Sequence, residues 1–176
     1  MIRVLDRNFE VSIPKETILQ RVSALAEQLN RDYEGRNPVV VCMLNGAFVF
    51  AADLVRMLSF QHEVLFCRYS SYEGMESSGH LKELMGISDS IAGRDVIILE
   101  DIVDTGYTME SVLPKFREKN PASVKLACML FKPAKLVADI SVDYYAMEIP
   151  NEFIIGYGLD YNGMGRHLPD IYTVVE

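Results

Sequence analysis

The sequence predicts an α/β fold, built on a mainly parallel twisted sheet that is flanked by helices. Short apolar runs rich in valine and isoleucine alternate along the chain with longer segments of helical period. Such alternation is typical of parallel sheets, whose strands are buried on both faces by the connecting helices. The length of 176 residues is that of one domain, so we expect 1–176 to fold as a single unit.

The first half of the chain predicts two helices and two strands. Apolar residues recur at helical spacing over 18–29, after Pro14, which indicates an amphipathic helix. The run 39–44 is continuously apolar, valine-rich and too short for a good helix, so we expect a buried strand there. A helix over 47–58 and a strand over 63–69 follow by the same criteria.

The second half continues the alternation. We expect a buried strand over 95–99, a helix over 108–119 and another buried strand over 124–131. Between the halves, 70–80 holds four serines and two glycines without any period. It is a surface loop or a mobile lid, since long polar loops in small domains often serve function. Three further short strands are expected at 144–147, 153–157 and 171–175.

Composition excludes several classes of protein. The chain has 25 acidic and 17 basic residues, a net charge of −8, which argues against a nucleic-acid or anionic-membrane surface. Its longest apolar runs are about six residues, whereas a membrane helix needs about 20, and charged residues near the start interrupt any secretory signal. Cys42, Cys67 and Cys128 are odd in number and far apart, as in a reduced cytoplasmic protein without disulfides or zinc.

The segment 96–109, VIILEDIVDTGYTM, is the main candidate for chemistry. A buried strand ends in Glu100 and Asp101, and the loop 104–108 leads into a helix. Gly106 permits a tight turn, and the free N–H groups of a helix start favour an anion. These features describe a phosphate-binding loop, although the lysine and spacing of the Walker loop are missing.

Three carboxylates beside a phosphate site would repel the phosphate unless they face something else. Sugar hydroxyls can donate to Glu100, Asp101 and Asp104, and Mg²⁺ can bridge such carboxylates to anionic oxygens. A phosphorylated sugar with a metal-bound polyphosphate satisfies both requirements. The residues alone leave a second interpretation open, in which Asp104 only caps the helix and the other two are solvated charges.

The same fourteen residues resemble the phosphoribosyl pyrophosphate signature of the type I phosphoribosyltransferases. Leu44-Asn45-Gly46 with the helix that follows resembles the pyrophosphate loop of the hypoxanthine-guanine phosphoribosyltransferases, and Ser71-Tyr72 resembles their lid. The order and spacing hold from about residue 40 to 168. Further similar elements are Lys132, the segments 148–150, 153–157 and 159–162, and Arg166.

The resemblance implies a specific fold and reaction. The fold would carry a small hood formed by about 1–12 and 150–176, and a flexible lid over about 70–82. The reaction would be the Mg²⁺-dependent transfer of a 5-phosphoribosyl group from phosphoribosyl pyrophosphate to N9 of a 6-oxopurine. Hypoxanthine would give IMP and guanine GMP, with release of pyrophosphate, as in purine salvage. A homodimer or homotetramer is implied as well.

The resemblance also assigns the phosphoribosyl site. Glu100 and Asp101 would hold the ribose hydroxyls, directly or through Mg²⁺. Asp104 would lie near N7 of the purine as the general acid/base. The 5′-phosphate would be bound by Asp104, Thr105, Gly106, Tyr107 and Thr108.

The remaining roles concern the purine and the pyrophosphate. Lys132 would donate to O6, Phe153 would stack on the base, and Ile154 would pair with it through its backbone. Asp160 would lie near the purine and help to hold a second Mg²⁺. Pyrophosphate would contact Leu44, Asn45, Gly46 and Arg166, and the lid residues Ser71 and Tyr72 would close over the site to exclude water.

The chain departs from the family at a few positions. Many relatives carry a basic residue in place of Asn45, and lysine or asparagine in place of Tyr107, so a pyrophosphate contact at Asn45 would use the backbone. The resemblance predicts a cis peptide bond between Leu44 and Asn45. The glycine-rich 163–165 makes the placement of Arg166 the less specific part of the match, and the residues do not rank hypoxanthine, guanine and xanthine.

Two other functions fit parts of the pattern. A non-catalytic regulator could keep the phosphoribosyl site as a nucleotide sensor, but it would need a basic surface or an added DNA-binding helix pair. A phosphoacceptor signalling domain also gathers acidic residues at strand ends. It would not need the lid, Lys132 and Asp160 together.

Overall fold

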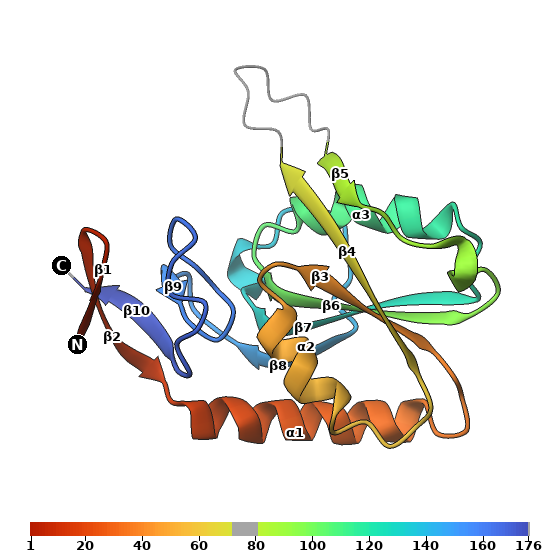
Figure 1. The fold of residues 1–176 in the computed structure, drawn as a ribbon, viewed down its shortest axis with the longest axis horizontal. Coiled ribbons are helices and arrows are strands. Elements are labelled where there is room, and N and C mark those ends of the chain that lie inside the picture. The colour runs from red at the N-terminus through yellow and green to blue at the C-terminus, as the bar shows by residue number, and fades with distance from the viewer. Residues whose placement is uncertain (72–80, 176) are drawn as a thin grey trace.

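A six-stranded sheet forms the centre of the molecule (Figure 1). The computed structural model describes residues 1–71 and 81–175. The strand order is β5-β4-β3-β6-β7-β8, and only β5 runs antiparallel to its neighbour. The predicted α/β fold with a mainly parallel sheet is therefore confirmed. The strands are β3 (Val39–Leu44), β4 (Glu63–Ser71), β5 (Leu81–Met85), β6 (Asp95–Val103), β7 (Ser123–Phe131) and β8 (Tyr144–Glu148).

Helices cover both faces of this sheet. α1 (Lys15–Asp32) and α2 (Phe48–Val55) lie on one face and α3 (Tyr107–Arg117) on the other (Figure 1). The predicted apolar stripe of α1 is buried, with Ile18 and Leu29 fully inaccessible. Burying both faces explains why the central strands read as unbroken apolar runs. Two short 3-10 helices, η1 (Asp89–Ile91) and η2 (Pro133–Lys135), lie in the connections.

A second, smaller sheet joins the two ends of the chain. β2 (Arg7–Ile13) pairs antiparallel with β10 (Ile171–Val175), and its own small core is built on Phe9, Ile155 and Tyr172. This is the hood that the resemblance implied, and Figure 1 shows it beside the start of α1. Its outer strands are β1 (Ile2–Val4) and β9 (Ile154–Ile155), in the order β1-β2-β10-β9.

Several predicted boundaries are wrong. β6 does not end near Leu99 but continues to Val103, because Ile102 and Val103 pair with Leu130 and Phe131 of β7. Glu100 and Asp101 therefore belong to the strand itself. The helix expected over 47–58 ends at Val55.

The structure also differs from the prediction in the segment 70–82, expected as a lid, and in the segment 153–157, expected as a strand. β4 runs to Ser71 and pairs with β5 from Leu81, so both ends of the range 70–82 are strand, and Tyr72 lies outside the described residues. The strand expected over 153–157 shrinks to Ile154–Ile155, because positive φ angles at 156–158 turn the chain. No helix in the described part of the chain is long and apolar enough to cross a membrane.

Candidate active site

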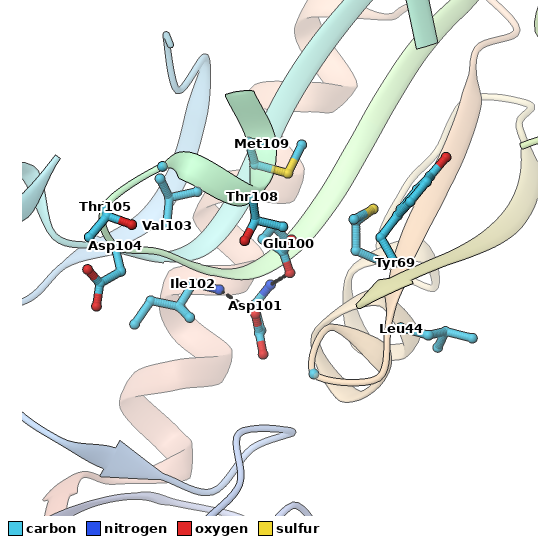
Figure 2. A pocket seen from close by; sticks show the side chains of 13 residues that line it. Leu44, Tyr69, Glu100, Asp101, Ile102, Val103, Asp104, Thr105, Thr108 and Met109 are labelled. Atoms are coloured by element: carbon cyan, nitrogen blue, oxygen red, sulfur yellow. Dashed lines mark hydrogen bonds between the residues drawn. The ribbon is translucent and has the colours of Figure 1, made fainter. Parts of the chain in front are cut away.

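A pocket of about 320 Å³ opens at the carboxyl ends of β3 and β6 (Figure 2). Every residue from Glu100 to Gly106 lines it, together with Thr108 at the start of α3. Leu44 ends β3, Gly46 comes from the loop after it, and Tyr69 comes from β4. Ligands bind at this end of parallel sheets because the loops and helix starts converge there. The segment 96–109, which sequence analysis selected as the main candidate for chemistry, therefore contributes most of the residues that line this pocket.

Glu100 and Asp101 form a pair of adjacent, partly buried carboxylates at the centre of the pocket (Figure 2). The Asp101 N–H donates to Glu100 Oε1 at 3.1 Å, and the Ile102 N–H donates to Asp101 Oδ1 at 2.8 Å. Burial raises the pKa of Glu100 well above the usual range of a carboxylic acid, and the charge of Asp101 raises it further. Burial also raises the pKa of Asp101, although the hydrogen bond with Glu100 and the charge of Arg166 oppose this.

This pair fits a hard divalent cation or sugar hydroxyls. Neither carboxylate forms a salt bridge with any residue that the structure describes. Carboxylate oxygens are the ligands that Mg²⁺ accepts, and it keeps several waters or substrate oxygens besides. In residues 1–71 and 81–175, no group of three or more acidic, cysteine or histidine side chains could hold a metal alone. Water or substrate oxygens would complete the coordination.

The loop from Asp104 to Thr108 turns sharply into α3. Gly106 adopts φ +86° at the N-cap of α3, a conformation that favours glycine, and no side chain caps this helix. The side chain of Asp104 instead accepts from Lys135 Nζ at 2.7 Å through Oδ2. The interpretation of Asp104 as a simple helix cap is therefore wrong. Tyr107 lies beyond the turn and is 54 % exposed.

Lys132 is a buried cation at the end of β7. Its side chain is 5 % exposed, and Nζ donates to the backbone oxygen of Glu152 at 2.8 Å. The same Nζ lies 3.7 Å from Asp104 Oδ2. Burial lowers the pKa of Lys132, while the charge of Asp104 opposes that shift. The structure thus brings the predicted purine contact next to the predicted acid/base, although the two are 28 residues apart in the sequence.

The loop Leu44-Asn45-Gly46, the predicted pyrophosphate loop, lies directly against Asp101. The Leu44–Asn45 peptide bond is cis, as the resemblance implied. A Cβ placed on Gly46 would overlap with the carboxylate of Asp101, so the loop backbone and the acid are in close approach. Only glycine permits that approach without moving one of the two segments.

Arg166 and Asp160 face each other within the hood loop. Arg166 Nη2 lies 2.7 Å from Asp160 Oδ1, and Nη1 donates to the Gly158 oxygen at 2.7 Å. Asp160 Oδ2 also accepts from the Gly163 N–H at 2.6 Å. Neither Asp160 nor Arg166 lines the pocket described above, but the charge of Arg166 reaches Asp101.

Phe153 and Ile154 also belong to the hood and do not line the pocket. The Phe153 ring is 44 % exposed, and its centroid lies 5.6 Å from that of Tyr161 in an edge-on arrangement. The guanidinium of Arg7 lies 5.8 Å from the centroid of Phe153. Ile154 pairs with Thr173 of β10, which fixes this short strand in the hood.

Sequence reasoning missed several residues of the site. Lys135 contacts Asp104. The sequence indicated this residue only by the presence of a second lysine three positions after Lys132. Tyr157 is 4 % exposed, and its hydroxyl donates to Asp53 Oδ2 at 2.7 Å, which no local pattern announced. Tyr69 lines the pocket, although the sequence pattern marked it only as the last residue of an expected strand.

The comparisons with known proteins agree with this geometry. The phosphoribosyl transferase domain family matches residues 14–162. The hypoxanthine-guanine phosphoribosyltransferase of Streptococcus thermophilus is 40 % identical over 168 residues, which cover 95 % of this chain and 93 % of that protein. Its counterpart from Lactococcus lactis is 38 % identical over 172 residues, covering 94 % and 93 % of the two chains.

Solved structures show the same relationship. A crystal structure of a hypoxanthine-guanine phosphoribosyltransferase from Bacillus anthracis has a TM-score of 0.90 and 37 % identity, covering 97 % of this chain and all of that one. A hypoxanthine phosphoribosyl transferase from Trypanosoma cruzi has a TM-score of 0.89 and 34 % identity over 99 % and 95 % of the two chains. By fold, pocket and sequence, the chain belongs to the phosphoribosyltransferase family, among the hypoxanthine-guanine phosphoribosyltransferases.

Proposed function

We propose that this protein transfers a 5-phosphoribosyl group from phosphoribosyl pyrophosphate to N9 of a 6-oxopurine, with Mg²⁺ as cofactor. The products are IMP or GMP and pyrophosphate, a purine salvage reaction. The observation that carries the proposal is the Glu100–Asp101 pair beside the loop from Asp104 to Thr108, with buried Lys132 next to Asp104. The pocket thus offers groups for a sugar and a phosphate, and Lys132 beside Asp104 offers a group for the base.

The sugar phosphate occupies the β6–α3 segment in this proposal. Backbone N–H groups of 104–108 and the hydroxyls of Thr105 and Thr108 donate to the 5′-phosphate, helped by the start of α3. Glu100 and Asp101 accept from the ribose hydroxyls. Glu100 and Asp101 would also hold Mg²⁺, which would supply positive charge to stabilise the pyrophosphate leaving group.

The purine lies beside Lys132 and the hood. Lys132 donates a hydrogen bond to the 6-oxo group. The 6-amino group of adenine is itself a donor, so it could not accept a hydrogen bond from the Lys132 ammonium. Phe153 stacks on the base, and Ile154 and Asp160 contact its far edge. Asp104 receives the proton that leaves the ring nitrogen as the bond from N9 to the ribose forms.

The pyrophosphate contacts the loop of Leu44, Asn45 and Gly46. Because Asn45 carries no charge, the backbone supplies the donors of this loop. Arg166 stabilises the charge that develops on the leaving group, once its contact with Asp160 is shared with substrate or metal. Ser71 and Tyr72 belong to a lid that excludes water from the activated sugar.

The alternative of a non-catalytic nucleotide sensor gains no support. The net charge of −8 gives no basic surface for nucleic acid. The relatives reported above are named as transferases. We further propose that the protein works in the cytoplasm, without nucleic-acid or membrane partners, as a homodimer or homotetramer.

One assay tests the reaction. The protein is incubated with phosphoribosyl pyrophosphate, Mg²⁺ and one of hypoxanthine, guanine, xanthine or adenine, and both nucleotide and pyrophosphate are measured. We expect turnover with hypoxanthine and guanine, none with adenine, and none without a divalent cation. Absence of turnover with every 6-oxopurine would refute the proposal, and turnover with adenine alone would refute the role of Lys132.

A variant tests the assignment of the acid/base. Asp104→Ala should lower kcat about 10²-fold or more, since a positioned acid/base contributes about 10²–10⁴ in rate. Binding of phosphoribosyl pyrophosphate, measured by calorimetry, should change little, because backbone groups supply most of the phosphate contacts. Unchanged kcat would remove Asp104 from the reaction.

A further inference from the structure

Lys135 makes the shortest cationic contact of Asp104. Lys135 Nζ lies 2.7 Å from Asp104 Oδ2, whereas Lys132 Nζ lies 3.7 Å from the same oxygen. Asp104 Oδ1 is buried and has no hydrogen-bond partner among the residues that the structure describes. The carboxylate therefore depends on Oδ2, and chiefly on Lys135, for its stabilisation within the protein.

The backbone around Lys135 is fixed to the loop that carries Asp104. The N–H groups of Val137 and Ala138 both donate to the Thr105 oxygen, at 3.0 Å each. The Lys132 N–H donates to the Val103 oxygen at 2.9 Å, so the segment is attached on both sides of η2. The backbone segments that carry Lys135 and Asp104 are thus held next to each other by main-chain hydrogen bonds.

Lys132 and Lys135 have different hydrogen-bond partners, which indicates that they have different roles. Lys132 is 5 % exposed and already donates to the Glu152 oxygen at 2.8 Å, on the side of the hood. Lys135, the last residue of η2, has a side chain that is 39 % exposed, and its ammonium contacts Asp104. Of the two lysines, only Lys135 lies within hydrogen-bond distance of Asp104 Oδ2, because Lys132 Nζ is 3.7 Å from that oxygen.

We propose that Lys135 is a positioning residue for the reaction, which fixes the carboxylate of Asp104 through Oδ2. It touches neither substrate nor cofactor and acts through Asp104 alone. The inference rests on the proposed function, in which Asp104 takes the proton that leaves the purine ring nitrogen. A carboxylate held by a fixed ammonium loses less entropy when it reaches the geometry for proton transfer.

The test compares single variants in steady-state kinetics with hypoxanthine. Lys135→Met, which keeps most of the side-chain length, should lower kcat about tenfold while KM for both substrates changes less than about twofold. Lys135→Arg should restore most of kcat, because a guanidinium can make the same contact. Lys125→Met is the matched control, since it also removes a partly exposed lysine paired with an aspartate, at 2.8 Å from Asp143, and should leave kcat unchanged.

A double variant separates this inference from the proposed function. Asp104→Ala and Asp104→Ala with Lys135→Met should have the same kcat, because Lys135 acts only through Asp104. Full activity of Asp104→Ala would refute the role of Asp104 itself. A loss in Asp104→Ala with unchanged or raised kcat in Lys135→Met, or additive losses, would refute the role of Lys135. Lys135→Gln repeats the test if the methionine variant unfolds.

Discussion

The hydroxyl of Tyr157 donates a hydrogen bond to Asp53 Oδ2 at 2.7 Å and so connects the hood loop to α2. Asp53 also pairs with Arg56, directly after the end of its helix. α2 begins directly after the pyrophosphate loop, and Tyr157 directly precedes Gly158, the backbone partner of Arg166. This single bond therefore joins the two segments to which pyrophosphate binding is assigned.

We expect Tyr157→Phe to lower the free energy of unfolding by about 1.5–3 kcal/mol, the usual contribution of a hydrogen bond to a charged group. Tyr157 is 4 % exposed, so water does not replace the lost partner. Urea unfolding measures the change. Tyr145→Phe is the control, since this tyrosine is 42 % exposed and its loss should cost less than about 0.5 kcal/mol. Equal effects of both variants would contradict a special role of the bond.

The buried carboxylate of Glu100 should make the ligand-free protein less stable as the pH rises. Its pKa lies well above 4.5, the ordinary value, because burial disfavours the charge and Asp101 adds repulsion. The folded protein thus binds this proton more tightly than the unfolded chain. The stability that protonation contributes is full below pH 4.5 and is lost as the pH rises through the raised pKa.

Glu100→Gln isolates this effect because glutamine resembles the protonated acid. The melting temperature of the variant minus that of the wild type should increase between about pH 5 and pH 8, measured by calorimetry without ligand. The same variant should lose catalytic activity. Glu118→Gln, at an exposed position, serves as the control. A difference in melting temperature that does not vary with pH would show that Glu100 titrates normally.

Gly46→Ala should impair catalysis more than folding. A Cβ at this position would overlap with the Asp101 carboxylate, so either the pyrophosphate loop or the acid must move. We expect kcat/KM for phosphoribosyl pyrophosphate to fall at least about tenfold, since small displacements of positioning groups are costly in rate. A Cβ at Gly35 meets no atom within 4 Å, although its φ of +71° strains an alanine. Gly35→Ala should therefore lose about 1 kcal/mol of stability but keep kcat/KM.

Sequence reasoning was most successful where one short segment carries both the structure and the chemistry. The apolar runs of β3, β6 and β7 identified buried strands, because helices on both faces leave no polar side to read. The order of Glu100, Asp101 and Asp104 along one segment sufficed to place them around one pocket. The cis peptide bond after Leu44 was predicted from the family resemblance, because no residue type at this position indicates it.

Features that depend on distant segments were not predictable in the same way. β2 has no continuous apolar pattern, and it becomes a strand by pairing with β10 at the other end of the chain. The extension of β6 to Val103 depends on its pairing with Phe131 in β7. The contacts of Tyr157 with Asp53 and of Lys135 with Asp104 join residues that are 104 and 31 positions apart, so only the folded geometry reveals them.

Lys132 should decide whether the enzyme accepts 6-oxopurines. It is a buried cation whose ammonium donates to the Glu152 oxygen and has two further N–H groups that could reach O6 of the base. Lys132→Met removes a charged hydrogen bond worth about 1.5–3 kcal/mol. We therefore expect kcat/KM for hypoxanthine to fall about 10- to 100-fold, while KM for phosphoribosyl pyrophosphate changes little. Lys119→Met removes a lysine paired with Asp89 on the surface and should leave both parameters unchanged. A loss that appears mainly in the use of phosphoribosyl pyrophosphate would place Lys132 at the sugar phosphate instead of the purine.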